Sequence, residues 1–259
     1  MLFSRIIWSS LAVALVVGSV QTGMQLLQAV PLVVAAELLE VDKTNSQASV
    51  LVAPVPDGAA DSHEHSHEHG SVNEWKPNSN VERIAWTWVA NSLHALSMAL
   101  VVFAVMGFWR YQRGSALNAL PLAGLVAAAG WLSFYLWPTL GLPLQLPGME
   151  TAALQARQVW SILAVASAAA ACALLGFGTF KWRWPIAAIF LALPFFVGAP
   201  QLGNDALAGS SDAQAALGQL AAQFFWATAW VSLSFWLTIG VACGCVFKRW
   251  LQPGLVATV

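Results

Sequence analysis

Four histidines occupy alternate positions in the segment HEHSHEH at 63–69, with two glutamates among them. Imidazole nitrogens are favoured ligands of cobalt, nickel, copper and zinc, and carboxylates add negative charge. In an extended chain this spacing places all four rings on one side. Because protonated imidazole cannot bind metal, affinity should fall below about pH 6. The ligand candidates are His63, His65, His67, His69, Glu64 and Glu68, and a solvated linker without metal is the alternative.

The same segment contains H-E-x-x-H, the zinc metalloprotease motif, at positions 63–67. That chemistry requires a helix, on which the two histidines share a face and the glutamate acts as general base. Here Gly58 and Gly70 flank an alternating tract with no apolar face. We therefore expect no enzymatic activity.

A second set of polar residues lies in otherwise apolar sequence. Gln21, Gln25 and Gln28 are spaced i, i+4 and i+7, which places them on one face of a helix. Polar side chains in a membrane usually face the bundle interior, where they bond to other helices or line a path. Both roles stay open for these glutamines. Just beyond them, Glu37 and Glu40 are three residues apart and are candidates to attract a cation, or are simply an exposed helix end.

His94 is the only histidine outside the 63–69 segment, and it shares a helical face with Asn91 and Met98. A polar group at membrane depth is costly unless it has a partner. His94 is therefore a candidate intramembrane metal ligand, with a hydrogen-bonded packing residue as the alternative. Asn91 is a candidate to line the passage beside it.

The composition indicates a lipid environment for these residues. Of 259 residues, 58% are hydrophobic and 9% are charged, against roughly 25% charged in soluble domains. The net charge of -1 offers no basic surface for nucleic acid. No G-x-x-x-x-G-K-[ST] motif is present, so the chain carries no P-loop for ATP.

Charged residues leave six uncharged stretches, at 6–36, 84–109, 114–149, 158–180, 184–204 and 213–247. Each reaches the ~20 residues that a helix needs to cross a hydrocarbon core of about 30 Å. The sequence predicts an all-α protein, a polytopic transmembrane helix bundle with six spans, or five as the alternative. The long segment after the first span is rich in Ser, Asn, Asp, Pro and Gly, and we expect a flexible outer loop.

Lys and Arg in short connections stay on the cytoplasmic side, and this rule sets the orientation. With the N-terminus inside, seven of the eleven basic residues fall inside and all twelve acidic residues fall outside. We expect both termini to be cytoplasmic, in the inner (plasma) membrane. The predicted parts are the first span at 1–36, the outer His/Glu-rich loop at 37–83, a five-span bundle at 84–250 and a cytoplasmic tail at 251–259.

Several motifs in order resemble the CbtA-type family of predicted cobalt transporter subunits, and they extend over nearly the whole chain. They are MLFSRIIWSS at 1–10, VPLVVAAELLE at 30–40, EWKPNSNVER at 74–83, LGLPLQLPGME at 140–150, LQARQVW at 154–160, LPFFVGAPQ at 193–201 and LAAQFFWATAWVSLSFWLTIG at 220–240. Two positions depart from the family pattern. Phe195 follows Pro194 where relatives usually have histidine, and Asn80 replaces an expected glycine.

The resemblance implies a two-component cobalt uptake system with a small, single-span, histidine-bearing membrane subunit as partner. The residues alone leave nickel and zinc open. We expect no resident cofactor. The leading hypothesis is that the 63–69 segment collects the ion, Glu37 and Glu40 receive it, and the polar faces of the first two spans line its passage. A membrane subunit that binds or delivers metal without transporting it is the alternative.

Overall fold

The computed structural model describes residues 2–38, 79–114, 117–142, 144–146, 152–200 and 212–253, and the regular secondary structure in these ranges is helical. No β-strand occurs in these ranges. The elements are α1 (Leu2–Gln28), α3 (Asn80–Arg113), α4 (Ala119–Trp131), the π-helical η1 (Leu132–Leu136), α5 (Trp137–Gly141), α6 (Leu154–Phe177), α7 (Arg183–Val197), α8 (Asp212–Val246) and the π-helical η3 (Phe247–Leu251). The predicted all-α class is confirmed. Helices satisfy their backbone polar groups internally, as a lipid environment demands.

Five helices are long and apolar enough to cross a membrane. They are Ser4–Gln28, Asn80–Arg113, Ala119–Gly141, Leu154–Phe177 and Gly218–Leu251. The stretch predicted as the fifth of six spans forms only the 15-residue α7, about 22 Å long against a core of about 30 Å. Six full-length spans are therefore not confirmed. α7 stops because Gly198 takes a φ of 82° and its N–H bonds to the Pro194 carbonyl, a helix-ending geometry.

Prolines interrupt two of the longer apolar stretches. α1 ends at Gln28, and the backbone is helical again over 30–38. Pro31 has no N–H, so the regular bond to the Leu27 carbonyl is lost. In the third stretch, α4 widens into η1 just before Pro138, and the Trp137 N–H bonds five residues back to Leu132. Such π segments are rare and occur often at functional sites.

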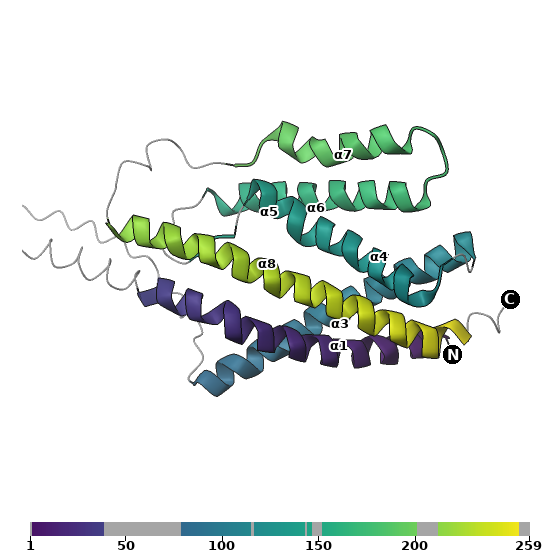
Figure 1. Cartoon of the computed structure of the whole chain (residues 1–259), viewed down its shortest axis with the longest axis horizontal. Helices are drawn as coiled ribbons and strands as arrows, with labels where there is room; N and C mark the ends of the chain where they lie inside the picture. The colour runs from purple at the N-terminus through teal and green to yellow at the C-terminus, as the bar shows by residue number, and fades with distance from the viewer. Residues whose placement is uncertain are drawn as a thin grey trace, which may run out of the picture.

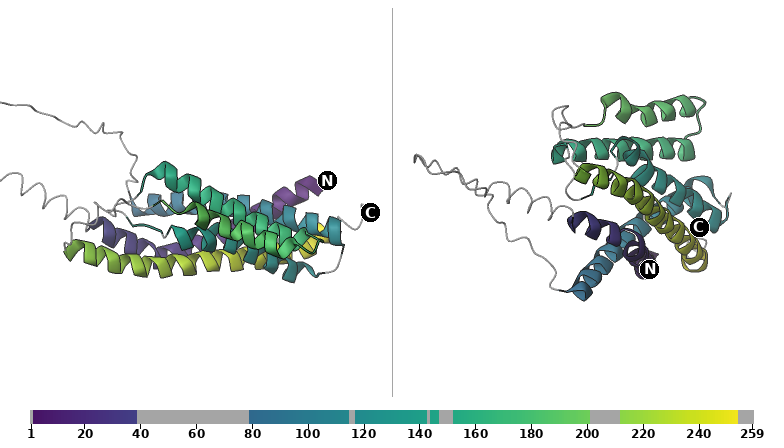
Figure 2. Two further views of the ribbon diagram at one scale, coloured as in Figure 1. Left: turned by 90° about the horizontal axis from the view of Figure 1, so that it is seen from above. Right: turned by 60° about the vertical axis from the view of Figure 1, so that its left-hand side comes forward.

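α1, α3, α4 and α8 form the packed centre of the molecule, while α6 and α7 lie side by side as an outer layer (Figures 1 and 2). The main core cluster draws its buried residues from α1, α3, α4, α8 and η3, and none of those given for it comes from α6 or α7. At the α4–α8 contact, a Cβ on Gly240 would lie 2.9 Å from the Ala127 Cβ. Small residues let apolar helices approach closely in this way.

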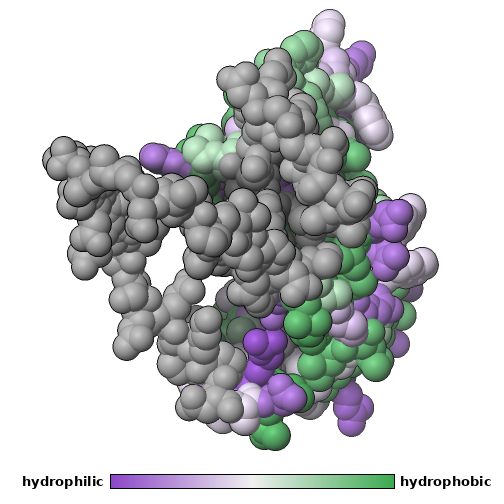
Figure 3. All heavy atoms as spheres, turned by 90° about the vertical axis from the view of Figure 1, so that its left-hand side faces the viewer, coloured by the Kyte–Doolittle hydropathy of each residue, from purple (hydrophilic) through white to green (hydrophobic). Residues whose placement is uncertain are grey.

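The start of α1 and the end of η3 lie together, because Arg5 and Arg249 line one cavity. The α3–α4 and α6–α7 connections are at this same end (Figure 1). Seven basic residues belong to these segments: Arg5, Arg110, Arg113, Lys181, Arg183, Lys248 and Arg249. The acidic residues in the described ranges, Glu37, Glu82 and Asp212, belong to helix ends on the opposite side. In the view onto that opposite end, hydrophilic residues lie beside hydrophobic ones among the coloured atoms (Figure 3).

Candidate functional site

A cavity of about 600 Å³ lies between α1, α3, η1 and α8, towards the end that carries the acidic residues. Most of its apolar lining comes from the helical segment around 29–34 and from α8, with Leu26 of α1 and Phe134 of η1. Its polar lining comes from four different elements. These polar residues are Gln21, Gln25, Arg83, Thr87, His94, Tyr135, Thr228 and Ser232. The structure thus brings together three residues that the sequence singled out separately, namely Gln21, Gln25 and His94.

Asn91 joins the two helices that carry those residues. Its Nδ2 group donates to Gln25 Oε1 at 2.8 Å and to Thr22 Oγ1 at 3.0 Å. Thr22 in turn donates to the Gly18 carbonyl at 2.8 Å. Asn91 does not line the cavity. In this structure it fixes the glutamine face of α1 against α3.

The α1–α3 contact is tight because Gly18 lies directly against Ser92. A Cβ at Gly18 would lie 2.5 Å from Ser92 Oγ and 2.8 Å from Ser92 Cα. Nearby, Trp88 Nε1 donates to Ser19 Oγ at 3.0 Å. Polar interhelical bonds of this kind typically contribute about 0.6 kcal/mol each in a membrane. Close backbone approach and three side-chain bonds together hold the cavity wall in register.

His94 lies against α8 and is exposed to the cavity. Its ring contacts that of Phe235, with centroids 5.1 Å apart and planes inclined by 34°. Within the described ranges, neither ring nitrogen has a hydrogen-bond partner. Gln21 is similar, since its side chain is 9% exposed and Oε1 is buried without a partner in the same ranges. Unsatisfied buried polar atoms are uncommon, so Gln21 Oε1 is available to a ligand, as is the exposed imidazole of His94.

Tyr135 of η1 and Thr228 of α8 line the cavity together. The Tyr135 hydroxyl and Thr228 Oγ1 are 3.3 Å apart, and Thr228 also donates to the Phe224 carbonyl at 2.8 Å. Neither residue was predicted from the sequence, and nor were Thr87, Ser232 and Arg83 as lining residues. Tyr135 belongs to η1, and the proline that follows this π segment was the sequence feature that could have indicated it. The single hydroxyl residues in apolar stretches carry no sequence feature that marks them as lining residues.

The other predicted site residues do not gather in this cavity. Gln28 does not line it, and its Oε1 is buried without a hydrogen-bond partner in the described part of the chain. Glu37 is exposed at the end of the helical segment 30–38. Met98, expected on the His94 face, instead lines a separate apolar cavity. Glu40 and the ligand candidates of 63–69 (His63, Glu64, His65, His67, Glu68 and His69) lie outside the described residues.

No cluster of three or more His, Cys, Asp or Glu side chains that could hold a metal occurs among the described residues. The cavity offers one imidazole with amide and hydroxyl oxygens instead. Phe195 lies elsewhere, edge-on to Trp137 and Trp160 at centroid distances of 5.6 and 6.2 Å. Neither Phe195 nor these two tryptophans line the cavity. The departure at position 195 therefore leaves its lining unchanged.

An apolar layer separates the cavity from the basic end of the molecule. Val13 and Val17 of α1, Ala99 and Val102 of α3 and Ile239 of α8 are each at most 2% exposed and belong to one cluster. They lie one or more turns beyond Gln21, His94 and Phe235 along their helices. An ion in the cavity would therefore meet closely packed apolar side chains before reaching that end.

Comparison with known proteins identifies the chain by family. Searches among curated proteins and among solved structures find no match. The family model of the probable cobalt transporter subunit, CbtA, matches residues 3–248, which is nearly the whole chain. The resemblance noted in the sequence is confirmed, and the chain belongs to the CbtA family of probable cobalt transporter subunits.

Proposed function

We propose that this chain is the membrane subunit of an uptake system for a divalent transition metal, with cobalt as the substrate, and that the ion passes through the cavity beside His94. The observation that carries the proposal is the convergence of His94, Gln21 and Gln25 on one cavity. These residues lie at helical spacing on two helices, and the Asn91 bonds hold the two faces together. Family membership supplies cobalt as the metal.

The donor set suits passage better than storage. Imidazole suits cobalt, nickel and zinc, whereas amide and hydroxyl oxygens are weaker ligands for them. One imidazole with a few oxygens leaves the ion part of its water shell and binds it weakly. Conduction requires binding strong enough to admit an ion and weak enough to release it. His94 would supply the nitrogen ligand, and Gln21 Oε1 an unpaired oxygen from α1.

The outer segments are assigned to capture. The 63–69 histidines and glutamates would collect the ion, and Glu37 and Glu40 would pass it to the cavity. Val33 and Val34 line the cavity wall, and Glu37 follows one turn later. Negative charge at an entrance raises the local cation concentration. Gln28 lies between the lining residues Leu26 and Ala29 along the chain and would contribute a further oxygen on this route.

Orientation and driving force follow from the charges. The seven basic residues at one end favour cytoplasmic termini by the positive-inside rule. Inward movement of a doubly charged ion across 100 mV then releases roughly 4.6 kcal/mol. The apolar layer beyond His94 must open for the ion to leave the cavity. We assign that opening to a conformational change of this chain together with its partner, a small single-span histidine-bearing subunit.

The test is cobalt accumulation in cells that express this chain, with and without the partner subunit. The amount of this chain in the membrane is kept equal in all strains. We expect accumulation above the empty-vector level when both are present, and competition by nickel or zinc shows how selective it is. Accumulation equal to the empty vector under every partner condition would refute transport.

The second candidate is a non-transporting subunit that binds metal and delivers it to another membrane protein. The closed apolar layer favours it, because the cavity is not continuous with the basic end. It predicts that replacing the four histidines of 63–69 abolishes metal binding, while His94→Ala changes neither binding nor uptake. The transport proposal predicts that His94→Ala lowers uptake at least tenfold even with the 63–69 segment intact.

A further inference from the structure

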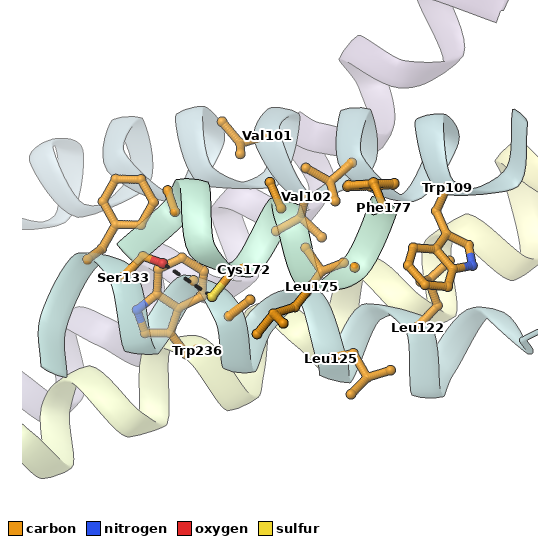
Figure 4. A pocket seen from close by; sticks show the side chains of 18 of the residues that line it. Val101, Val102, Trp109, Leu122, Leu125, Ser133, Cys172, Leu175, Phe177 and Trp236 are labelled. Carbon is orange, nitrogen blue, oxygen red and sulfur yellow. Dashed lines mark hydrogen bonds between the residues drawn. The ribbon is translucent and has the colours of Figure 1, made fainter. Parts of the chain in front are cut away.

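A second cavity, of about 360 Å³, lies between α3, α4 and α6 and is almost wholly apolar. Such a volume is typical of small-molecule sites, which span roughly 300–1,000 Å³. Ser133 and Cys172 are its only polar side chains apart from indole groups, and they interact with each other at 3.9 Å. Figure 4 shows these two residues and Trp236 at one end and Trp109 at the other.

The dimensions of this groove match a lipid chain. Along α3 its lining runs from Met98 to Trp109, eleven residue steps or about 16 Å. One leaflet is half of a hydrocarbon core of about 30 Å, or about 15 Å. The groove is therefore about as long as one acyl chain within a leaflet.

The Trp109 end of the groove carries positive charge. Arg113 lies over the Trp109 ring, 5.4 Å from its centroid. Arg113 and Arg183 both donate to the Gly178 carbonyl, at 3.5 and 2.7 Å, next to the lining residue Phe177. Arg110 Nε and Trp109 Nε1 are buried donors without a hydrogen-bond acceptor in the described ranges.

No acidic residue of the described ranges is available to this cationic end, because Glu37, Glu82 and Asp212 belong to the opposite end of the bundle. Two guanidinium groups and two unpaired buried donors therefore call for an anion from outside the chain. Basic pockets between transmembrane helices are the usual binding sites of anionic lipid headgroups.

We propose that the groove between α3, α4 and α6 binds one anionic phospholipid, with an acyl chain along Met98 to Trp109 and the headgroup phosphate at Arg113 and Arg183. The lipid then fills the contact between the α6–α7 layer and the packed centre of the molecule. This inference depends on the membrane setting and is independent of metal transport.

The experiment is native mass spectrometry of the purified full chain in detergent, titrated with phosphatidylglycerol or with phosphatidylcholine of the same acyl chains. We expect one retained phosphatidylglycerol per chain and much weaker phosphatidylcholine binding. Arg113→Gln with Arg183→Gln should weaken phosphatidylglycerol binding roughly 30-fold, from the contribution of two cations near a membrane surface. Ala173→Trp, which fills the groove, should abolish binding of both lipids.

Two control variants match these changes. Lys248→Gln with Arg249→Gln removes the same charge at the same end of the bundle, at exposed positions outside the groove lining. Ala166→Trp places the same side chain on an exposed position of α6 outside the groove. Both should bind phosphatidylglycerol as the wild type does. If Ala173→Trp fails to fold, phosphatidylglycerol binding by the double variant Arg113→Gln, Arg183→Gln tests the proposal alone. Equal binding of the two lipids, unchanged binding by the arginine pair, or a retained peptide in place of phospholipid would overturn the proposal.

Discussion

Gly18→Ala should force α1 and α3 apart and damage the cavity that they enclose. The added Cβ would lie 2.5 Å from Ser92 Oγ, 2.8 Å from Ser92 Cα and 2.9 Å from Ser92 N. Non-bonded carbon atoms are most stable at about 3.5–4.0 Å. Rotation of the serine side chain relieves only the first of these clashes, because the other two involve backbone atoms. The helices must therefore separate by about 1 Å near this point.

The expected loss of stability has two parts. Overpacking of a close contact costs about 1–3 kcal/mol. A separation of that size also stretches the Asn91–Gln25 and Trp88–Ser19 bonds, now 2.8 and 3.0 Å, beyond hydrogen-bonding distance. Two interhelical bonds in a membrane contribute about 1.2 kcal/mol together. The free energy of unfolding should fall by about 2–4 kcal/mol in total.

The assay is reversible unfolding of the purified chain in mixed micelles, followed by the intensity of tryptophan fluorescence. Gly23→Ala is the matched control, because it makes the same change on the same helix and nothing lies within 4 Å of its Cβ. Ser92→Gly in the Gly18→Ala background should restore only part of the loss, since the clash with the backbone of residue 92 remains. If Gly18→Ala were as stable as Gly23→Ala, the close packing of α1 against α3 would be refuted.

Three further substitutions test the cavity wall and its entrance. Asn91→Leu removes the donor to Gln25 and should lower the free energy of unfolding by about 1 kcal/mol; an unchanged value in the same micelle assay contradicts the network. Tyr135→Phe deletes only the long contact to Thr228, so we expect a loss of at most about 0.6 kcal/mol, and a loss several times larger would show that the hydroxyl has another partner. Arg83→Gln removes a positive charge that lies about 16 Å along α3 from the His94 imidazole. With the dielectric constant of water, loss of this repulsion should improve the affinity for a divalent ion by about twofold at low salt. That gain should vanish in uptake assays at high ionic strength, and weaker uptake at low salt would contradict a cation route past this residue.

Helical spacing predicted which side chains of a single helix face the same way. Gln21 and Gln25 share a face of α1, and Asn91 and His94 share a face of α3, as their spacing indicated. The expectation that these faces turn inward agrees with the bonds from Asn91 to Gln25. Of the two roles left open for the glutamine stripe, the interhelical bond occurs at Gln25, which also lines the cavity, and the lining of a path stays a prediction.

Pairing between distant helices could not be read from spacing. Tyr135 and Thr228 are polar side chains in apolar stretches, and they meet only because η1 and α8 lie on the same side of the cavity. Met98 follows His94 by four residues, a net rotation of only about 40°, yet it lines the apolar cavity with residues of α4 and α6. Hydropathy also overestimated α7, because it registers apolar residues and not the helix stop at Gly198.

Passage of the ion beside His94 is tested most directly by the initial rate of cobalt uptake by His94→Ala. Ser97→Ala is the control, one turn away on the same helix, exposed and outside the cavity lining. Both variants should be compared with the wild type at equal membrane abundance, with the partner subunit present. We predict at least a tenfold loss for His94→Ala, comparable to the ~10–100-fold cost of disturbing a metal ligand's surroundings, and no change for Ser97→Ala. Wild-type uptake by His94→Ala would contradict passage beside this residue.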